Sequence, residues 1–248
     1  MAGLDDLKIK VFADGAQLEG IKALCENPVV KGFTTNPSLM RVAGVEDYAA
    51  FAKEVLSVVP DHPVSFEVFA DDLPTMEAQG RVIASWGDNV NVKIPVTNTK
   101  GESTAPIIQR LSDAGVVLNV TAIFTLDQVQ TVTDALNKDV GAIISVFAGR
   151  IADTGIDPIP LMRFAKDIMA AKPKAELLWA SSRELLNIFH AEESGSDIIT
   201  VTHEMLGKLS LLGKDLDQYS LETVQAFYKD ATASGYTIDT DEKVAAST

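Results

Sequence analysis

The sequence predicts a single-domain α/β fold, a (β/α)8 (TIM) barrel with a C-terminal helix. Apolar runs rich in Val, Ile and Phe recur eight times along the 248 residues, with segments of helical periodicity between them. Such strict alternation is typical of one parallel sheet with right-handed crossovers, and eight units in about 250 residues fit a closed barrel. An open doubly wound sheet is the alternative, but residues 13–17 lack the glycine signature normal for its first turn.

The predicted strands are nearly continuous in apolarity, as expected for parallel strands covered on both faces. They are residues 9–14, 30–36, 64–70, 91–96, 117–124, 142–148, 176–181 and 198–202. Helical periodicity is clearest over residues 18–25 and 48–55. The predicted helix starts are a capping box at Thr125 and Gln128, the pair Asp157–Pro158, the pair Ser181 and Glu184, and Ser220. We expect the barrel to cover residues 1–238 and residues 239–248 to form a polar, frayed tail.

The charge balance excludes several classes of partner. The formal net charge is −14, which argues against a nucleic-acid binder and against docking on an anionic membrane surface. No apolar run reaches the roughly 18 residues of a membrane span, and the N-terminus shows no secretory signal. These features predict a cytoplasmic protein.

The cysteine and histidine content limits covalent and metal chemistry. Cys25 is the single cysteine, so no intrachain disulfide can form, and its place on an apolar helix face predicts a buried structural thiol. The three histidines, His62, His190 and His203, are scattered without zinc-ligand spacing. We therefore expect no metal site.

Polar residues stand at or near the carboxyl end of each predicted strand, where burial alone would not select them. In a barrel these ends converge on one face, which is where active sites lie. Individually, Asp14 or Thr202 can be a helix cap and Asn36 a turn residue. Together they predict a polar site on one rim. The residues are Asp14, Asn36, Glu67, Lys93, Asn119 with Thr121, Ser145, Ser181 and Thr202.

Lys93 is the residue that burial explains least, because it lies between Val92 and Ile94 inside the fourth run. One interpretation is a structural ion pair with Glu67 or Asp14. The other is a nucleophilic amine. Burial disfavours the ammonium form and frees the lone pair, which can add to a ketone and form a Schiff base. Glu67 and Asp14 would then carry the proton transfers.

Two arginines follow the sixth and seventh runs on the same rim. Arg150 and Arg183 lie close in sequence to Ser145 and Ser181, and guanidinium groups beside a helix N-terminus form a good phosphate site. Surface ion pairing in an acidic protein is the alternative interpretation. The pattern predicts a local positive site for an anionic substrate.

Seven segments carry a family resemblance: FAD (12–14), GFTTNPSL (32–39), SFEV (65–68), VKIPVT (92–97), LNVTAIFTLDQV (118–129), SVFAGRI (145–151) and ASSRE (180–184). Together they resemble the transaldolase family, especially its short members, which include fructose-6-phosphate aldolases. The resemblance extends over about residues 9–238. TTNPS and VKIP in this order are a specific combination.

The resemblance implies a class I Schiff-base mechanism without metal or organic cofactor. Lys93 looks like the Schiff-base lysine, and Asp14 looks like the acid–base group for the C4 hydroxyl proton. Glu67 and Thr121 look like the pair that holds and activates the catalytic water. The implied substrate-binding residues are Asn36, Asn119 and Ser145 at the dihydroxyacetone hydroxyls, Arg150, Ser181 and Arg183 at the phosphate, and Thr34 and Phe147.

Two positions bear on the reaction type. Aldolase-type members usually carry Gln at the position of Glu67 and Tyr at that of Phe147, so this chain looks like a transaldolase. It departs from the family pattern at three places. Gly15 follows Asp14 where threonine is usual, Val146 replaces a proline, and Glu184 replaces Asn or Lys.

We therefore expect an enzyme that transfers dihydroxyacetone from fructose 6-phosphate or sedoheptulose 7-phosphate to an aldose phosphate. The setting would be the pentose phosphate pathway or a specialised sugar pathway. A lyase that releases free dihydroxyacetone, and a non-catalytic barrel that binds phosphosugars, are the alternatives. Phosphorylated sugars are the expected partners, and a homo-oligomer is the expected assembly.

Overall fold

A computed structural model describes residues 7–238 of the chain. It divides into two compact units, one that ends at Leu209 and one that begins at Ser210. The predicted barrel domain, 1–238, therefore includes a segment that the structure assigns to the second unit. The predicted tail, 239–248, lies outside the described residues.

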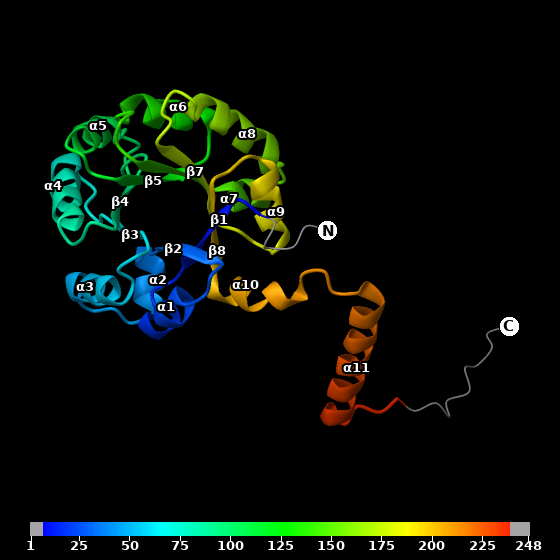
Figure 1. The fold of residues 1–248 in the computed structure, drawn as a ribbon. Helices are drawn as coiled ribbons and strands as arrows, with labels where there is room; N and C mark the ends of the chain where they lie inside the picture. Colours follow the sequence, from blue (N-terminus) through cyan, green and yellow to red (C-terminus); the bar gives the residue numbers. More distant parts are fainter. Residues whose placement is uncertain (1–6, 239–248) are drawn as a thin grey trace. The chain divides into compact units, whose positions relative to one another are not determined.

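The first unit is a closed barrel of eight parallel strands in the order β1 to β8, with β8 paired back to β1 (Figure 1). The predicted fold class is thus confirmed. The strands are β1 (Lys10–Asp14), β2 (Val30–Thr34), β3 (Val64–Glu67), β4 (Val90–Pro95), β5 (Leu118–Ile123), β6 (Ala142–Val146), β7 (Ala175–Trp179) and β8 (Ile198–Thr202).

Helices α1 to α9 lie between the strands and form the outer layer of the ring, and α10 follows β8 (Figure 1). They are α1 (Leu18–Cys25), α2 (Pro37–Val42), α3 (Tyr48–Val58), α4 (Leu73–Ala84), α5 (Ala105–Asp113), α6 (Leu126–Ala135), α7 (Ala148–Asp153), α8 (Pro158–Met169), α9 (Leu186–Glu193) and α10 (His203–Gly207). The second unit contains α11 (Leu216–Ser234), capped by Asp215. Among residues 7–238, none of the helices combines the length and the apolar character that crossing a bilayer requires.

Local capping chemistry explains where several helices begin. Thr125 and Gln128 form the predicted reciprocal capping box at α6. The Asp157 side chain accepts from the backbone N–H of Ile159 at α8, as predicted. Two predicted starts are wrong, those at Ser181 and at Ser220.

Each error has a local cause. Ser181 lies in the left-handed region at φ 64°, and α9 begins only at Leu186. Asn187 accepts from the backbone N–H groups of Arg183 and Glu184, which satisfies that turn without a serine cap. Ser220 lies inside α11, because Asp215 caps the helix five residues earlier.

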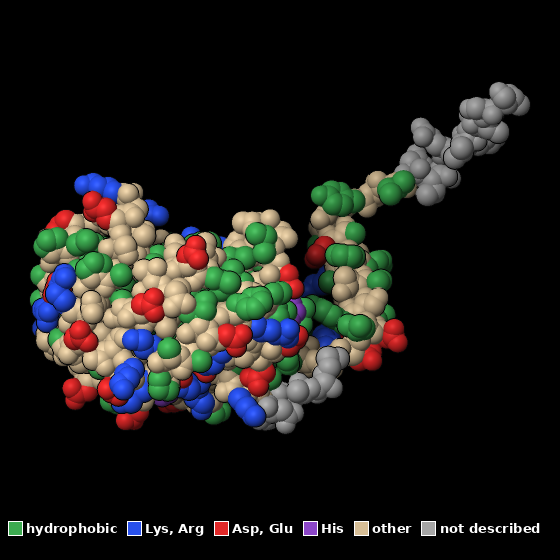
Figure 2. Space-filling model, turned by 90° about the horizontal axis from the view of Figure 1, so that it is seen from above, with side chains coloured by type: hydrophobic (Ala, Val, Ile, Leu, Met, Phe, Trp, Pro, Cys, Tyr) green, Lys and Arg blue, Asp and Glu red, His purple; other side chains and the backbone are tan. Residues whose placement is uncertain are grey.

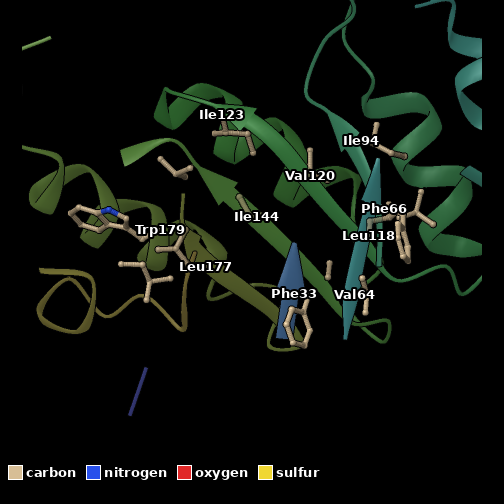
Figure 3. Close-up of a cluster of buried hydrophobic side chains, with 14 of the residues drawn as sticks. Phe33, Val64, Phe66, Ile94, Leu118, Val120, Ile123, Ile144, Leu177 and Trp179 are labelled. Atoms are coloured by element: carbon tan, nitrogen blue, oxygen red, sulfur yellow. The ribbon is translucent and has the colours of Figure 1, made fainter. Parts of the chain in front are cut away.

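The two faces of the strands differ in character. Outward-pointing residues pack against the helices in the main hydrophobic core, of which Figure 3 shows Val120, Ile144 and Trp179. A smaller apolar cluster fills part of the barrel interior, with Phe12, Ile143, Leu178, Ala180 and Ile198. Side chains alternate along each strand, so the next inward positions are Asp14, Ser145 and Thr200.

Gly32 of β2 makes room for this inner cluster, since a Cβ there would lie 2.6 Å from the Phe12 ring. On the outer surface, acidic and basic side chains are interspersed over the face of the barrel that Figure 2 shows.

Candidate active site

A cavity of about 570 Å³ opens at the carboxyl ends of the strands. Every predicted site residue except Thr202 and Arg183 lines it. The lining side chains come from all eight strands and from the loops after them. The lining residues are Asp14, Thr34, Asn36, Pro37, Ser38, Leu39, Glu67, Lys93, Asn119, Thr121, Ala122, Ser145, Phe147, Arg150, Leu178, Ala180, Ser181 and Thr200.

Lys93 lies at the centre of the polar groups and is only 8% exposed. Its Nζ is 3.0 Å from Oε2 of Glu67 and donates to the carbonyl oxygen of Thr35 at 3.1 Å. The register places Glu67 of β3 directly opposite Lys93 of β4. The ion pair considered from the sequence is thus present, and it lines the cavity, where a bound molecule can reach it.

Asp14 ends β1 beside this pair. Its Oδ1 accepts a hydrogen bond from Oγ1 of Thr34 at 2.8 Å, and the two residues are register partners on β1 and β2. Burial raises the pKa of the Asp14 carboxyl, while the positive charge of Lys93 lowers it in part. A carboxyl with these opposing influences suits a group that must both take and return a proton.

A chain of hydrogen bonds crosses three strands beside Lys93. The Ser145 hydroxyl donates to Oδ1 of Asn119 at 2.6 Å, and Nδ2 of Asn119 donates to Oγ of Ser65 at 2.9 Å. These contacts fix the amide orientation of Asn119. Ser65 was missed in the sequence analysis. Its one available signal was a polar side chain two residues before Glu67, hence on the same face of β3.

Strained backbone lies at the cavity wall. Ala122 has φ 61°, and the pairing of β5 with β6 is irregular between Val120 and Ile123. The irregularity lets both Thr121 and Ala122 face the cavity. Oγ1 of Thr121 is buried without a hydrogen-bond partner among the described residues, so it is available to a bound molecule.

One wall of the cavity is formed by apolar aromatic rings, with a cationic side chain next to them. Phe147 packs against Phe124 with ring centroids 5.6 Å apart, and Cζ of Arg150 lies 5.0 Å from the Phe147 ring. Within residues 7–238, Arg150 forms no ion pair. Gly149 allows α7 to lie close to the loop at Ser181, because a Cβ on Gly149 would lie only 1.6 Å from the carbonyl oxygen of Ser181.

Arg183 is the predicted site residue that the structure places elsewhere. Its guanidinium forms a two-point ion pair with Asp153 on α7 and does not line the cavity. Both side chains are about half exposed, so water screens this pair and its net strength is small. The phosphate role that the resemblance implies for Arg183 stays a prediction.

At two other strand ends, those of β8 and β2, the predicted polar residue serves as a helix cap. Thr202 caps α10 through the backbone N–H of Met205, and Thr200, two residues earlier, lines the cavity in its place. Asn36, for which a turn was the alternative, is instead the N-cap of α2, where its Oδ1 accepts from the backbone N–H of Leu39, and it also lines the cavity. The sequence identified the correct strand but the wrong threonine on β8.

Cys25 is a partly buried thiol, 3.6 Å from Nδ1 of His62. Burial raises its pKa, so the thiol is not activated as a nucleophile. Within residues 7–238, no group of three or more His, Cys, Asp and Glu side chains is arranged to hold a metal ion.

Fold and cavity together define a class: a (β/α)8-barrel protein with a lysine-centred site at the carboxyl ends of its strands. The sequence matches the family described as Transaldolase/Fructose-6-phosphate aldolase over residues 11–245. The chain belongs to this family. The predicted membership is therefore confirmed.

Individual relatives agree with this assignment. The chain is 35% identical to a probable transaldolase of Dehalococcoides mccartyi, over 80% of this chain and 88% of the relative. It is 37% identical to a probable transaldolase of Streptococcus equi subsp. zooepidemicus, over 82% and 90%. The crystal structure of 2,3-dimethylmalate lyase shares the fold, with TM-score 0.53 and 16% identity over 98% of this chain and 89% of that one.

Proposed function

We propose that the protein is a class I Schiff-base transaldolase. It transfers a dihydroxyacetone unit from a ketose phosphate, fructose 6-phosphate or sedoheptulose 7-phosphate, to an aldose phosphate. The observation that carries the proposal is the buried Lys93 amine, held between Glu67 and the Thr35 carbonyl in a cavity that also contains Asp14. The relatives named probable transaldolases support it.

Imine formation begins when the Lys93 ammonium loses its proton, for which Glu67, 3.0 Å away, is the nearest carboxylate. The neutral amine attacks C2 of the ketose, and the resulting carbinolamine loses water as the imine forms. The free hydroxyl of Thr121 and the carboxyl of Glu67 are suited to hold that water and to shuttle its protons.

Carbon–carbon cleavage uses Asp14. Its carboxylate takes the proton of the C4 hydroxyl, the C3–C4 bond breaks, and the electron pair enters the imine to give an enamine on Lys93. The aldehyde product leaves. The same steps in reverse join the enamine to an acceptor aldehyde, so Asp14 returns the proton that it took.

The remaining lining residues account for substrate binding. Asn119, with its amide fixed by Ser145 and Ser65, offers hydrogen bonds to the dihydroxyacetone hydroxyls. Arg150, Ser181 and the α7 region lie where the phosphate end of the sugar would reach. Arg183 joins them only if its ion pair with Asp153 opens.

Transfer rather than release follows from the character of the wall beside the enamine. Phe147 and Phe124 present apolar rings there, and neither supplies a hydroxyl to protonate the enamine or to position water. A lyase of the fructose-6-phosphate aldolase type is the alternative. It would need a proton donor at this wall.

An assay with and without acceptor separates the two reactions. We expect rapid formation of glyceraldehyde 3-phosphate from fructose 6-phosphate when erythrose 4-phosphate is present, and slow release of dihydroxyacetone without it. Phe147→Tyr should increase release, whereas Phe69→Tyr, a matched change outside the cavity, should not. Rapid release by the unmodified protein would favour the lyase, and no reaction with any phosphosugar would favour a non-catalytic binder.

A further inference from the structure

The imidazole of His203 lies in a notch beside Asp14. His203 is the first residue of α10, directly after β8, and β8 pairs with β1 so that Thr202 lies opposite Asp14. A Cβ on Gly15 would lie 2.8 Å from Nε2 of His203, and a Cβ on Gly20 would lie 2.5 Å from its Cε1. The ring therefore occupies space that exists only because both residues are glycine.

Asp14 and His203 also line one small cavity of about 210 Å³. Nε2 of His203 is buried without a hydrogen-bond partner among the described residues. On Asp14, Oδ1 is engaged by Thr34, and Oδ2 has no partner within residues 7–238. A buried polar atom left unpaired costs free energy, so the imidazole of His203 gains if it donates to Asp14 across this cavity.

Few other charges act on this pair. Lys93 and Glu67 are the other charged groups that act on Asp14. Around His203, Glu204 is paired with Lys208, and Glu19 on α1 is paired with Lys22. Burial lowers the pKa of His203, and the negative charge of Asp14 raises it in part. A neutral imidazole is thus favoured, and it can donate from Nε2.

We propose that His203 is a positioning residue for Asp14, whose carboxylate accepts a hydrogen bond from Nε2 of His203, directly or through one water molecule. The bond favours the ionised carboxylate, which is the form that takes the C4 hydroxyl proton as the C3–C4 bond breaks. His203 itself does not touch the substrate. The inference rests on the proposed function, because it assigns Asp14 the role of proton acceptor.

The pH profile of the cleavage step tests this role. His203→Leu keeps an apolar side chain in the notch but removes the donor, so the pKa of Asp14 should rise. The acid limb of the profile should then move to higher pH by about one unit. His203→Gln, which keeps an amide donor, should restore part of the shift. Gly15→Ala should reproduce it, because the methyl group displaces the imidazole.

Borohydride trapping on Lys93 should survive in all three variants, since imine formation does not use His203. An acid limb in His203→Leu identical to that of the unmodified enzyme would overturn the inference. If the unmodified protein neither traps nor cleaves phosphosugars, the proposed function fails, and a second measurement still decides the inference.

That measurement is the NMR titration of the imidazoles in the ligand-free protein, which has only three histidines to assign. Asp14→Asn removes the charge that raises the pKa of His203, so its titration should move to lower pH, while those of His62 and His190 stay unchanged. An unchanged His203 titration would show that the two side chains are not coupled.

Discussion

The two faces of the barrel strands carry different information. On β4, Val92 and Ile94 point outward and are completely buried against the helix layer, whereas Lys93 between them points into the cavity. The outward face follows the rule of close packing and apolar burial. The inward face near the carboxyl ends breaks that rule with charges and hydroxyls. Charged and hydroxyl side chains on a face enclosed by the fold indicate a functional role for that face.

Substitutions on the two faces of a strand should therefore have opposite effects on stability and activity. A truncated outward side chain should reduce stability and leave the chemistry intact. A truncated side chain that lines the cavity should reduce turnover or substrate affinity and leave the fold intact. Each variant below is expected to fall on one side of this division.

The largest effect is expected for Lys93→Ala. The nucleophile disappears, so turnover of fructose 6-phosphate should be lost completely. The thermal unfolding midpoint should change little, because Glu67 is left at the cavity, where water reaches it. Turnover in coupled assays and unfolding by circular dichroism check both halves. Lys100→Ala, at an exposed lysine, is the matched control.

Asp14→Asn should slow carbon–carbon cleavage by about 10²- to 10⁴-fold, the usual contribution of a positioned acid–base group. Trapping of the imine on Lys93 should persist, because Glu67 serves that step. Single-turnover kinetics with fructose 6-phosphate measure the first effect, and reduction with borohydride measures the second. Loss of trapping would give Asp14 an earlier role than cleavage.

Ile94→Ala tests the outward face of the same strand. Ile94 is fully buried, so its truncation should lower the free energy of unfolding by about 2–5 kcal/mol. The kcat of the folded enzyme should remain close to normal. Urea denaturation gives the stability change. A large fall in kcat with unchanged stability would contradict the division between the two faces.

Arg150→Ala is expected to have the smallest of these effects. A charge-assisted hydrogen bond contributes about 1.5–3 kcal/mol, so KM for phosphorylated sugars should rise about 10- to 150-fold. KM for unphosphorylated sugars should stay nearly constant. Arg183→Ala should change KM less than Arg150→Ala, because Arg183 must first leave Asp153. Equal losses for both classes of sugar would mean that the arginines serve the structure.

The sequence was sufficient for features that depend on local pattern. Apolar runs at regular spacing predicted the barrel, and charges inside those runs singled out Lys93 and Glu67. It was insufficient where a partner is distant along the chain. Nothing near Arg183 in the sequence indicates its ion pair with Asp153, 30 residues away.

Strand register and backbone conformation could not be predicted from the sequence either. Only the strand pairing decides that Thr200, not Thr202, lines the cavity, and Ala122 gives no sequence signal of its positive φ. The notch for His203 requires Gly15 and Gly20 to face a residue more than 180 positions later in the chain. Such features emerge from tertiary packing and are not encoded in local periodicity.

The proposed mechanism depends on a covalent imine between Lys93 and a ketose phosphate. The most direct measurement is borohydride reduction of the protein with fructose 6-phosphate, followed by peptide mapping in a mass spectrometer. We expect one stable adduct, located on Lys93 and absent from Lys93→Ala. An adduct on another lysine, or no adduct at all while turnover proceeds, would contradict it.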